Sequence, residues 1–255
     1  MSDLHLDHPG SAGPPALAEG VHMVLVAGDT CEGLVKAVER LRSAYPTPTE
    51  IAMVSGNHEL WSKTVDFGEH WKMGHSAAER HGVHLLENSV EIVGGVRLMG
   101  CSLWTDYELF GARLREVAMY TASRTMLDHR RIKWSRHPWQ RFRPAEARIL
   151  HHRSRSFLEA ELAKPHDGPT VCISHHAMTL DAVAPAVRDN VITAAYASEM
   201  SPMIDRFQPD LIVSGHTHYA MDLRRGRTRL LSNPAGYPGE IRSFDPTCTV
   251  DLPIS

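Results

Sequence analysis

The sequence predicts an α/β protein in which buried strands alternate with helices. Short apolar runs end in glycine or serine followed by polar residues, and each run has the length of a buried strand. Segments with helical composition lie between these runs, as in an α/β sandwich with buried sheets. A chain of 255 residues corresponds to about one large domain, or to one domain with an insertion. We therefore expect a single domain over residues 1–255.

The predicted elements follow in chain order. Strands that precede polar clusters are residues 22–27, 50–54, 170–173 and 210–213, and helices between the early strands are residues 34–43 and 65–81. Two hairpins surround glycine turns, one joining residues 90–93 to 96–99 and one joining residues 221–223 to 228–231. Because open α/β sheets bind ligands at the carboxyl ends of their strands, the polar clusters mark the expected site.

Composition and charge exclude several classes of protein. Hydrophobic residues make up 42% of the chain and charged residues 22%, which fits a globular core and excludes disorder or a fibrous repeat. A net charge of -3 and a pI near 6.6 exclude a strongly basic binder, and we expect no nucleic-acid partner. No apolar run approaches the roughly 18 to 20 residues of a membrane span, and no signal peptide is visible.

Cysteine usage bears on the compartment. The four cysteines stand far apart and form no Cys-x-x-Cys pair, which indicates reduced thiols rather than a disulfide or zinc framework. We therefore expect a cytoplasmic protein whose chemistry does not depend on cysteine.

Residues 105–156 interrupt the alternation and are predicted to form a helical cap insertion. Within residues 111–156, twelve Lys or Arg stand against three acidic residues. One interpretation is a positive patch that steers an anionic substrate, and the other is a solvated helical face. Arg130, Arg131 and Arg143 are the candidate substrate contacts under the first interpretation.

The chain has 17 histidines, and several fall in the polar clusters. A lone histidine is more often a structural group, and a Gly-Asp pair is usually a turn. We accordingly expect packing roles for His176 and surface or core positions for histidines such as His75. Five blocks in a fixed order are harder to explain by chance: Ser2-Asp3-Leu4-His5, Gly28-Asp29, Gly56-Asn57-His58-Glu59, His175 and Gly215-His216-Thr217-His218.

These blocks resemble the calcineurin-like metallophosphoesterase family, and Asn233-Pro234-Ala235-Gly236 is similar to the closing strand and turn of that family. The resemblance implies a four-layer α/β/β/α sandwich of two mixed β-sheets flanked by helices. It also implies two metal ions with Asp29 as the bridge between them. One ion would take Asp3, His5, Asp29 and His218, and the other Asp29, Asn57, His175 and His216.

These residue types suit metal-dependent phosphoryl transfer. Nitrogen and oxygen ligands fit two divalent or trivalent ions such as Mn, Fe, Zn, Ni or Co. Two cations about 3.5 to 4 Å apart can clamp both oxygens of a phosphoryl transfer, and a hydroxide bridging them can attack phosphorus in line. His58, which follows the ligand Asn57, is the candidate to stabilise developing charge or to protonate the leaving oxygen. Glu59 is the candidate to orient its neighbours.

The predicted function is hydrolysis of a small phosphorylated substrate, with phosphodiesters slightly preferred because compact family members often act on diesters. A phosphomonoesterase or nucleotide phosphatase on the same site is the alternative. A non-catalytic protein-binding scaffold is the rival from another class. Such relatives lose metal ligands or the histidine after the asparagine ligand, whereas both Asn57 and His58 are present here. A structural metal centre is disfavoured because it needs about four ligands, whereas about eight ligand positions are present.

The start of the chain departs from the family pattern. In the family a strand precedes the first aspartate, whereas Asp3 is the third residue here. We expect the natural chain to begin several residues upstream, and intact-mass analysis of the native protein would test this.

Overall fold

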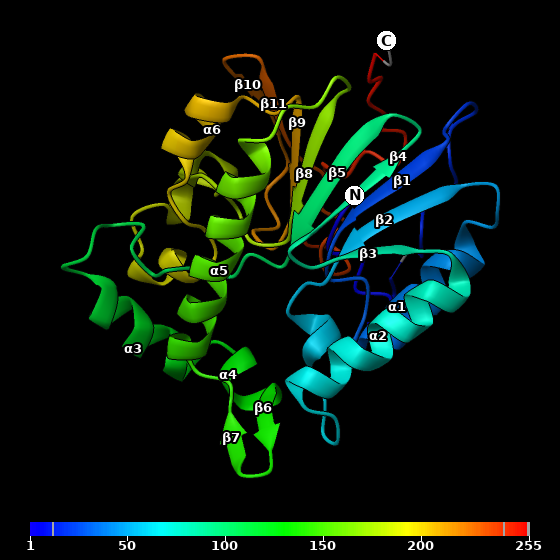
Figure 1. Ribbon diagram of the computed structural model, residues 1–255. Coiled ribbons are helices and arrows are strands. Elements are labelled where there is room, and N and C mark those ends of the chain that lie inside the picture. The colour runs from blue at the N-terminus through cyan, green and yellow to red at the C-terminus, as the bar shows by residue number, and fades with distance from the viewer. Residues whose placement is uncertain (12, 242, 254–255) are drawn as a thin grey trace.

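The structure, a computed structural model, describes residues 1–11, 13–241 and 243–253 and has four layers (Figure 1). Two helices, α1 (Leu34–Ala44) and α2 (Phe67–His81), cover a three-stranded sheet. A six-stranded sheet packs behind it and is covered on its outer face by α5 (Pro144–Leu162) and α6 (Ser201–Phe207). The predicted four-layer α/β/β/α sandwich is confirmed. Within the described residues, every helix is too short or too polar to cross a bilayer.

The two sheets differ in their strand directions. The three-stranded sheet has the order β1-β2-β3 and contains only parallel pairs. The six-stranded sheet has the order β10-β11-β9-β8-β5-β4, and its β4–β5 and β10–β11 pairs are antiparallel hairpins among parallel neighbours. Only the six-stranded sheet is therefore mixed, where both were expected to be. The reason is that helices α1 and α2 connect the strands of the smaller sheet, and a crossover through a helix returns the chain in the same direction.

The strand bounds agree with the predicted ones within two residues. The three-stranded sheet consists of β1 (Met23–Ala27), β2 (Glu50–Val54) and β3 (His84–Leu86). The six-stranded sheet consists of β4 (Ser89–Val93), β5 (Val96–Cys101), β8 (Thr170–Ser174), β9 (Leu211–Ser214), β10 (Met221–Arg225) and β11 (Thr228–Ser232). Strand β3 and helix α6 were not predicted.

One hydrophobic core lies between the sheets, where side chains such as Val54, Leu98 and Val213 are fully or almost fully buried. The central strands are also covered on their outer faces, by Leu34 and Val38 of α1 on one side and by Leu158 of α5 on the other. Strands buried on both faces consist of continuous apolar runs, which explains why the sequence shows runs rather than alternation.

The predicted cap at residues 105–156 is only partly helical. It contains α3 (Arg115–Thr125), α4 (Asp128–Arg131) and a hairpin of β6 (Lys133–Arg136) and β7 (Trp139–Arg141), followed by the first part of α5. Its apolar side chains, including Ile132 and Phe142, belong to a cluster that they share with neighbouring residues such as Trp104. The region is thus anchored by apolar burial and also reaches the neighbourhood of β2, because Trp61 belongs to the same cluster.

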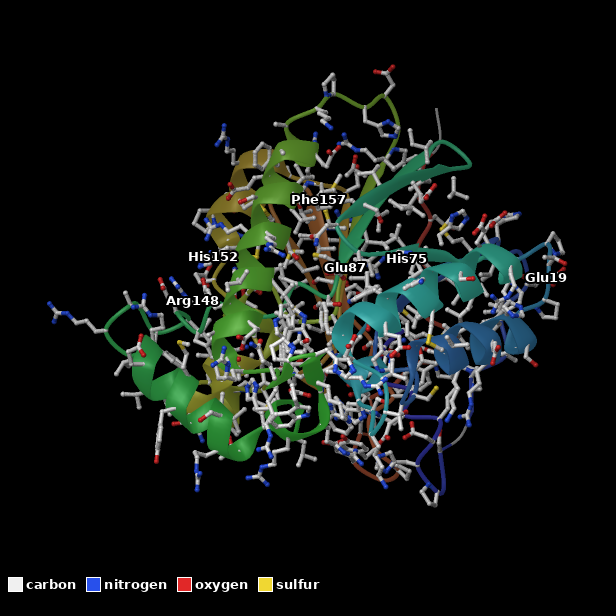
Figure 2. All side chains as sticks on the ribbon, turned by 60° about the horizontal axis from the view of Figure 1, so that its bottom comes forward. Glu19, His75, Glu87, Arg148, His152 and Phe157 are labelled. Atoms are coloured by element: carbon white, nitrogen blue, oxygen red, sulfur yellow. The ribbon has the colours of Figure 1, made fainter. Side chains whose placement is uncertain are left out.

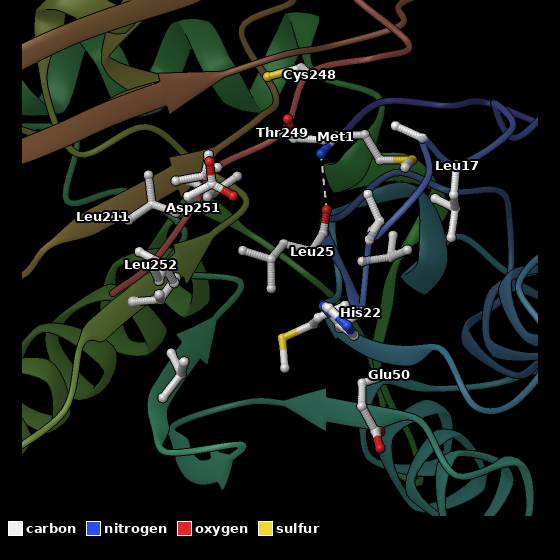
Figure 3. Close-up of a pocket in the computed structure, with 18 of the residues that line it drawn as sticks. Met1, Leu17, His22, Leu25, Glu50, Leu211, Cys248, Thr249, Asp251 and Leu252 are labelled. Carbon is white, nitrogen blue, oxygen red and sulfur yellow. Dashed lines mark hydrogen bonds between the residues drawn. The ribbon is translucent and has the colours of Figure 1, made fainter. Parts of the chain in front are cut away.

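Residues Met1 and Ser2 lie beside the end of β1. The Met1 ammonium donates to the Leu25 carbonyl at 2.9 Å, and the amide of Ser2 donates to the Asn233 carbonyl at 3.2 Å. A cavity of about 760 Å³ lies next to Met1 and is lined by apolar side chains of both sheets and by the C-terminal segment, including Leu252 (Figure 3). These contacts hold Asp3 at the strand-end edge, and the upstream start stays a prediction.

Candidate metal centre

The candidate ligands meet where strands of both sheets end. Asp29 follows β1 and Asn57 lies three residues beyond β2, while His175 directly follows β8 and His216 lies two residues beyond β9. Parallel strands that share a sheet end at the same edge, so residues far apart in sequence come together there. All four side chains are buried or nearly so.

The backbone at these positions is strained. Non-glycine residues rarely adopt positive φ, and such conformations cost about 1–3 kcal/mol each when the surrounding structure enforces them. Five of the seven candidate ligands have positive φ: Asp3 (53°), His5 (42°), Asp29 (55°), His216 (66°) and His218 (51°). These five are half of the ten described non-glycine residues with positive φ, and their clustering at one edge indicates that their placement serves a function.

Two glycines allow the turns to approach the ligands. A Cβ atom on Gly28 would lie 2.6 Å from Nδ1 of His175, and one on Gly56 would lie 2.1 Å from Oδ1 of Asp29. Gly28 also has a φ of 81°, which side chains disfavour. The Gly28-Asp29 and Gly56-Asn57 blocks therefore require glycine for space.

The donor atoms form three overlapping groups, each with its atoms within 4.8 Å of one another. The groups are Asp3, His5 and His218; His5, Asp29 and His58; and Asp29, His175 and His216. Asn57 joins the last group because its Oδ1 lies 2.9 Å from Nε2 of His175. The structure thus brings all seven sequence-predicted ligands together, with Asp29 in two of the groups.

Hydrogen bonds fix which ligand atoms carry lone pairs. Nδ1 of His175 lies 2.8 Å from the Ala27 carbonyl, which can only accept, so Nδ1 carries the hydrogen and Nε2 a lone pair. Nδ2 of Asn57 donates to Asp128 at 2.8 Å, so the Oδ1 atom of Asn57 faces Nε2 of His175. Two acceptors 2.9 Å apart have no hydrogen to share, and a cation bound by both would remove the repulsion. This donor set fits a metal ion.

The group of Asp3, His5 and His218 is also oriented by hydrogen bonds. Nδ1 of His218 lies 2.7 Å from the Glu240 carboxylate, which turns Nε2 toward Nε2 of His5 at 3.1 Å and Oδ1 of Asp3 at 3.4 Å. Burial lowers the pKa of His218, but the bond to Asp3 and the charges of Asp3 and Glu240 outweigh it and raise the pKa to about 9. Burial lowers the pKa of His5 to about 4, so its imidazole is neutral and can bind a cation.

Buried carboxylates give the centre a negative potential. Burial, together with the charges of Glu59 and Asp3, raises the pKa of Asp29 well above its usual range. Among the described residues, no lysine or arginine forms an ion pair with these three carboxylates. Glu59 accepts the backbone N–H groups of Asp29 and Gly56 at 3.0 and 2.8 Å, so it orients the turns, as its predicted role requires. Cations bound at the centre would compensate this buried charge.

His58 lies beside Asp29, between the donors proposed for the two metal ions. Its ring stacks on Trp61 with a centroid distance of 3.6 Å, and its Nε2 lies 3.8 Å from Oδ2 of Asp29 and 3.3 Å from the hydroxyl of Tyr237. Burial and the neighbouring imidazoles lower the pKa of His58 to about 2, so its ring is neutral. Tyr237 also stacks on His5 at 4.3 Å. Tyr237 was not predicted from the sequence, although the turn at residues 233–236 that precedes it was a signal.

A second missed residue, Asp128, comes from α4 in the cap region. It is 3% exposed, and its Oδ1 accepts from Nδ2 of Asn57 at 2.8 Å and from Nε1 of Trp61 at 2.7 Å. It therefore holds the amide of Asn57 with its oxygen toward His175. Its only sequence signal was that it is one of three acids in a strongly basic segment.

We expect Asp128→Leu to weaken metal binding at the group containing Asn57 by about 10- to 100-fold, the usual effect of removing a partner that orients a ligand. Leucine matches the size of aspartate closely and removes both accepted bonds. The matched control is Asp128→Asn, whose Oδ1 can still accept from Asn57 and Trp61, and which should bind metal nearly as the native protein does. Metal titration of the stripped proteins measures the difference, and equal affinity of Asp128→Leu and the native protein would contradict this role.

The three cap arginines do not line the cavity of about 440 Å³ at this centre. Arg130 donates to the Arg124 carbonyl at 2.6 Å, and Arg143 pairs with Glu146. Arg131 pairs with Glu32 at 2.7 Å, and its guanidinium lies 4.6 Å from the ring centroid of Trp61. The structure places none of them with the candidate ligands, so their role in substrate binding stays a prediction.

The remaining histidines that were considered from the sequence lie outside the three donor groups. The ring of His176 is buried, its Nδ1 bonds the Ser102 carbonyl at 3.0 Å, and it packs on His216, as expected for a packing role. His75 projects from α2 and His152 from α5 (Figure 2), and neither belongs to the three donor groups.

Clustered nitrogen and oxygen donors at the strand ends of a two-sheet sandwich are the features of a metal-dependent enzyme. The family model of calcineurin-like phosphoesterases matches residues 2–220, so the chain belongs to this family and is a metal-dependent hydrolase. No curated protein matches the chain.

The chain is similar to solved structures at low identity. The chain is similar to the phosphopantetheinyl hydrolase of Mycobacterium tuberculosis, with 19% identity over 95% of this chain and 92% of that one and a TM-score of 0.73. A candidate 5′-nucleotidase of Staphylococcus aureus, solved with α-ketoglutarate, is 14% identical over 82% of this chain and 39% of that one, with a TM-score of 0.46. At 19% identity the similarity to the phosphopantetheinyl hydrolase supports the fold alone.

Proposed function

We propose that this protein hydrolyses phosphodiesters of small molecules with two bound metal ions. The observation that carries the proposal is the set of donor groups that overlap at Asp29 and His5, in which Oδ1 of Asn57 faces Nε2 of His175 at 2.9 Å with no hydrogen between them. One ion would be held by Asp3, His5, Asp29 and His218, and the other by Asp29, Asn57, His175 and His216. The donor set admits Mn, Fe, Zn, Ni or Co.

When bound, two such ions supply an activated water and neutralise charge on the phosphoryl oxygens. The chain's own residues position the ester and stabilise its charge. His58 is neutral and buried beside Asp29, so it can donate a hydrogen bond to a phosphoryl or leaving oxygen as negative charge develops there. Tyr237 and Trp61 hold the imidazole from two sides.

The cavity supports a diester over a monoester. It has a volume of about 440 Å³ and extends from His58 to the cap residues around Leu127, which leaves room for a second esterified group. A phosphomonoesterase or nucleotide phosphatase on the same centre is the second candidate, since the donor groups would serve either ester. A protein-binding scaffold is disfavoured because the complete donor set is retained. The proposal includes a reducing, cytoplasmic location, which the four free cysteines of the described chain support.

The test is hydrolysis of bis(p-nitrophenyl) phosphate and of p-nitrophenyl phosphate by metal-stripped protein to which single metals are returned. We expect two ions per chain at full activity, no turnover in the stripped protein, and faster cleavage of the diester. Faster cleavage of the monoester would favour the phosphatase. Absence of turnover with both metals bound would overturn the proposal.

A further inference from the structure

The cavity at the candidate metal centre has two chemically different sides. One side is formed by the donor groups, with Asp29, Asn57 and His216 among its residues, and by His58. The other side is formed by the cap region and by the short helical segments after β8. The substrate's phosphate belongs on the first side, so the second side receives an ester group.

The second side is mostly apolar, with Thr125, Asn190 and Thr193 as its neutral polar members. Met126 and Leu127 come from the link between α3 and α4, and Val187 and Ile192 come from the segments η3 (Pro185–Val187) and η4 (Val191–Ala195). The ring of Tyr196 stacks on His216 at a centroid distance of 4.9 Å and continues this side toward the donor groups. An apolar or aromatic group placed here gains about 25 cal/mol for each Å² of apolar surface that it removes from water.

Acidic side chains outnumber cationic ones at the cavity. The described residues that line it include Asp29, Asp128 and Glu240 but no lysine or arginine, and the one raised-pKa imidazole, His218, is already paired with Asp3 and Glu240. The nearby Arg188 is committed elsewhere, because its guanidinium donates to the carbonyls of Val183 and Asp181 at 2.8 and 3.1 Å. An ester group with a negative charge of its own would therefore meet carboxylates and no compensating cation beyond the metal centre.

We propose that this cavity selects phosphodiesters by the ester group that stays on phosphorus when the leaving group departs. It accepts diesters in which this retained group is uncharged and apolar or aromatic, and it rejects diesters in which this group carries a further negative charge. This inference rests on the proposed function and adds the class of substrate. It differs from substrate steering by the cap arginines, whose guanidinium groups lie outside the cavity.

Two diesters with the same leaving group test the selection. Phenyl p-nitrophenyl phosphate has a neutral second group, and 4-carboxyphenyl p-nitrophenyl phosphate has an anionic group of similar size. We expect kcat/KM of the metal-loaded protein to be roughly tenfold higher for the phenyl diester, because like charges repel in a poorly solvated cavity. Equal values, or a preference for the carboxyphenyl diester, would overturn the inference while leaving diester hydrolysis intact.

A charge introduced into the apolar side sharpens the test. Val187 is 47% exposed, so Val187→Lys can fold with its ammonium at the cavity. We expect this variant to lower the phenyl-to-carboxyphenyl ratio of kcat/KM at least about fivefold. The control is Val117→Lys, on α3 and 50% exposed but outside the cavity lining, which should keep the native ratio. An unchanged ratio in Val187→Lys would contradict the proposed placement of the ester group.

A binding measurement distinguishes failure of this inference from failure of the proposed function. If neither diester is cleaved, the proposed function fails, but calorimetric binding of diphenyl phosphate and of bis(4-carboxyphenyl) phosphate to the metal-loaded protein still compares the two groups. Tighter binding of diphenyl phosphate would support the cavity's selectivity, and equal or weaker binding would overturn it.

Discussion

Asp29→Asn is expected to lose both bound metal and hydrolytic activity. Asp29 is the only carboxylate that joins two of the donor groups in the described structure, and an amide cannot supply two anionic oxygens to two cations. Losing the Lewis-acid contribution of a metal ion costs several kcal/mol of transition-state stabilisation. A cost of about 4 kcal/mol corresponds to a roughly 10³-fold drop in kcat/KM. Metal counting and kinetics on the same preparation measure both effects.

Stability of the metal-free form distinguishes this loss from misfolding. Asparagine at position 29 can still accept the His58 N–H group, which donates to Oδ1 of Asp29 at 2.9 Å. It also removes a negative charge from the neighbourhood of Glu59 and Asp3, which raise the pKa of Asp29. The stripped variant should therefore be at least as stable as the stripped native protein. Asp222→Ala, which removes an exposed partner of Arg229, is the control and should keep two metals. Two tightly bound ions in Asp29→Asn would contradict the bridging role.

His58→Ala is expected to lower kcat by about 10²- to 10³-fold while metal content stays near two ions per chain. The reason is that the imidazole reaches the cavity beside Asp29, whereas the seven donors of the two proposed metal sets remain in place. His58→Gln retains a hydrogen-bond donor and should recover part of the activity. Kinetics and metal counting of both variants make the measurement.

Two outcomes would contradict this role for His58. Full activity of His58→Ala would show that the imidazole does not act on the ester. Loss of metal would show instead that His58 is a ligand, an arrangement that the donor group of His5, Asp29 and His58 also permits.

The sequence-based prediction of the cap was only partly right, and the reason is local. The basic segment at residues 111–156 was predicted as helical, but β6 and β7 form a hairpin within it. Pro138 lies between these strands, and a proline ring cannot continue a helix through that position. The charge of the segment was also misleading as a guide to geometry, because Arg131 and Arg143 pair with Glu32 and Glu146. Long flexible side chains reach carboxylates on whichever element folds next to them.

The sequence predicted the alternation of strands and helices, and its resemblance to the calcineurin-like family implied the layered fold and the seven candidate ligands. Apolar runs buried on both faces mark the central strands, and the Gly28-Asp29 and Gly56-Asn57 blocks directly follow them, so strand direction brings their side chains to one edge. These features are local, since each depends on a strand and on the turn that ends it.

The distant groups that support that edge became visible only in the folded protein. Asp128 is 71 residues from Asn57, and Tyr237 is 179 residues from His58, yet each lies within hydrogen-bond distance of its partner. The apolar side of the cavity likewise combines the cap with the segments after β8. Periodicity in a sequence reports which face of an element is buried, whereas the identity of the neighbour depends on how whole elements pack, because packing is set by the combined shape of many side chains.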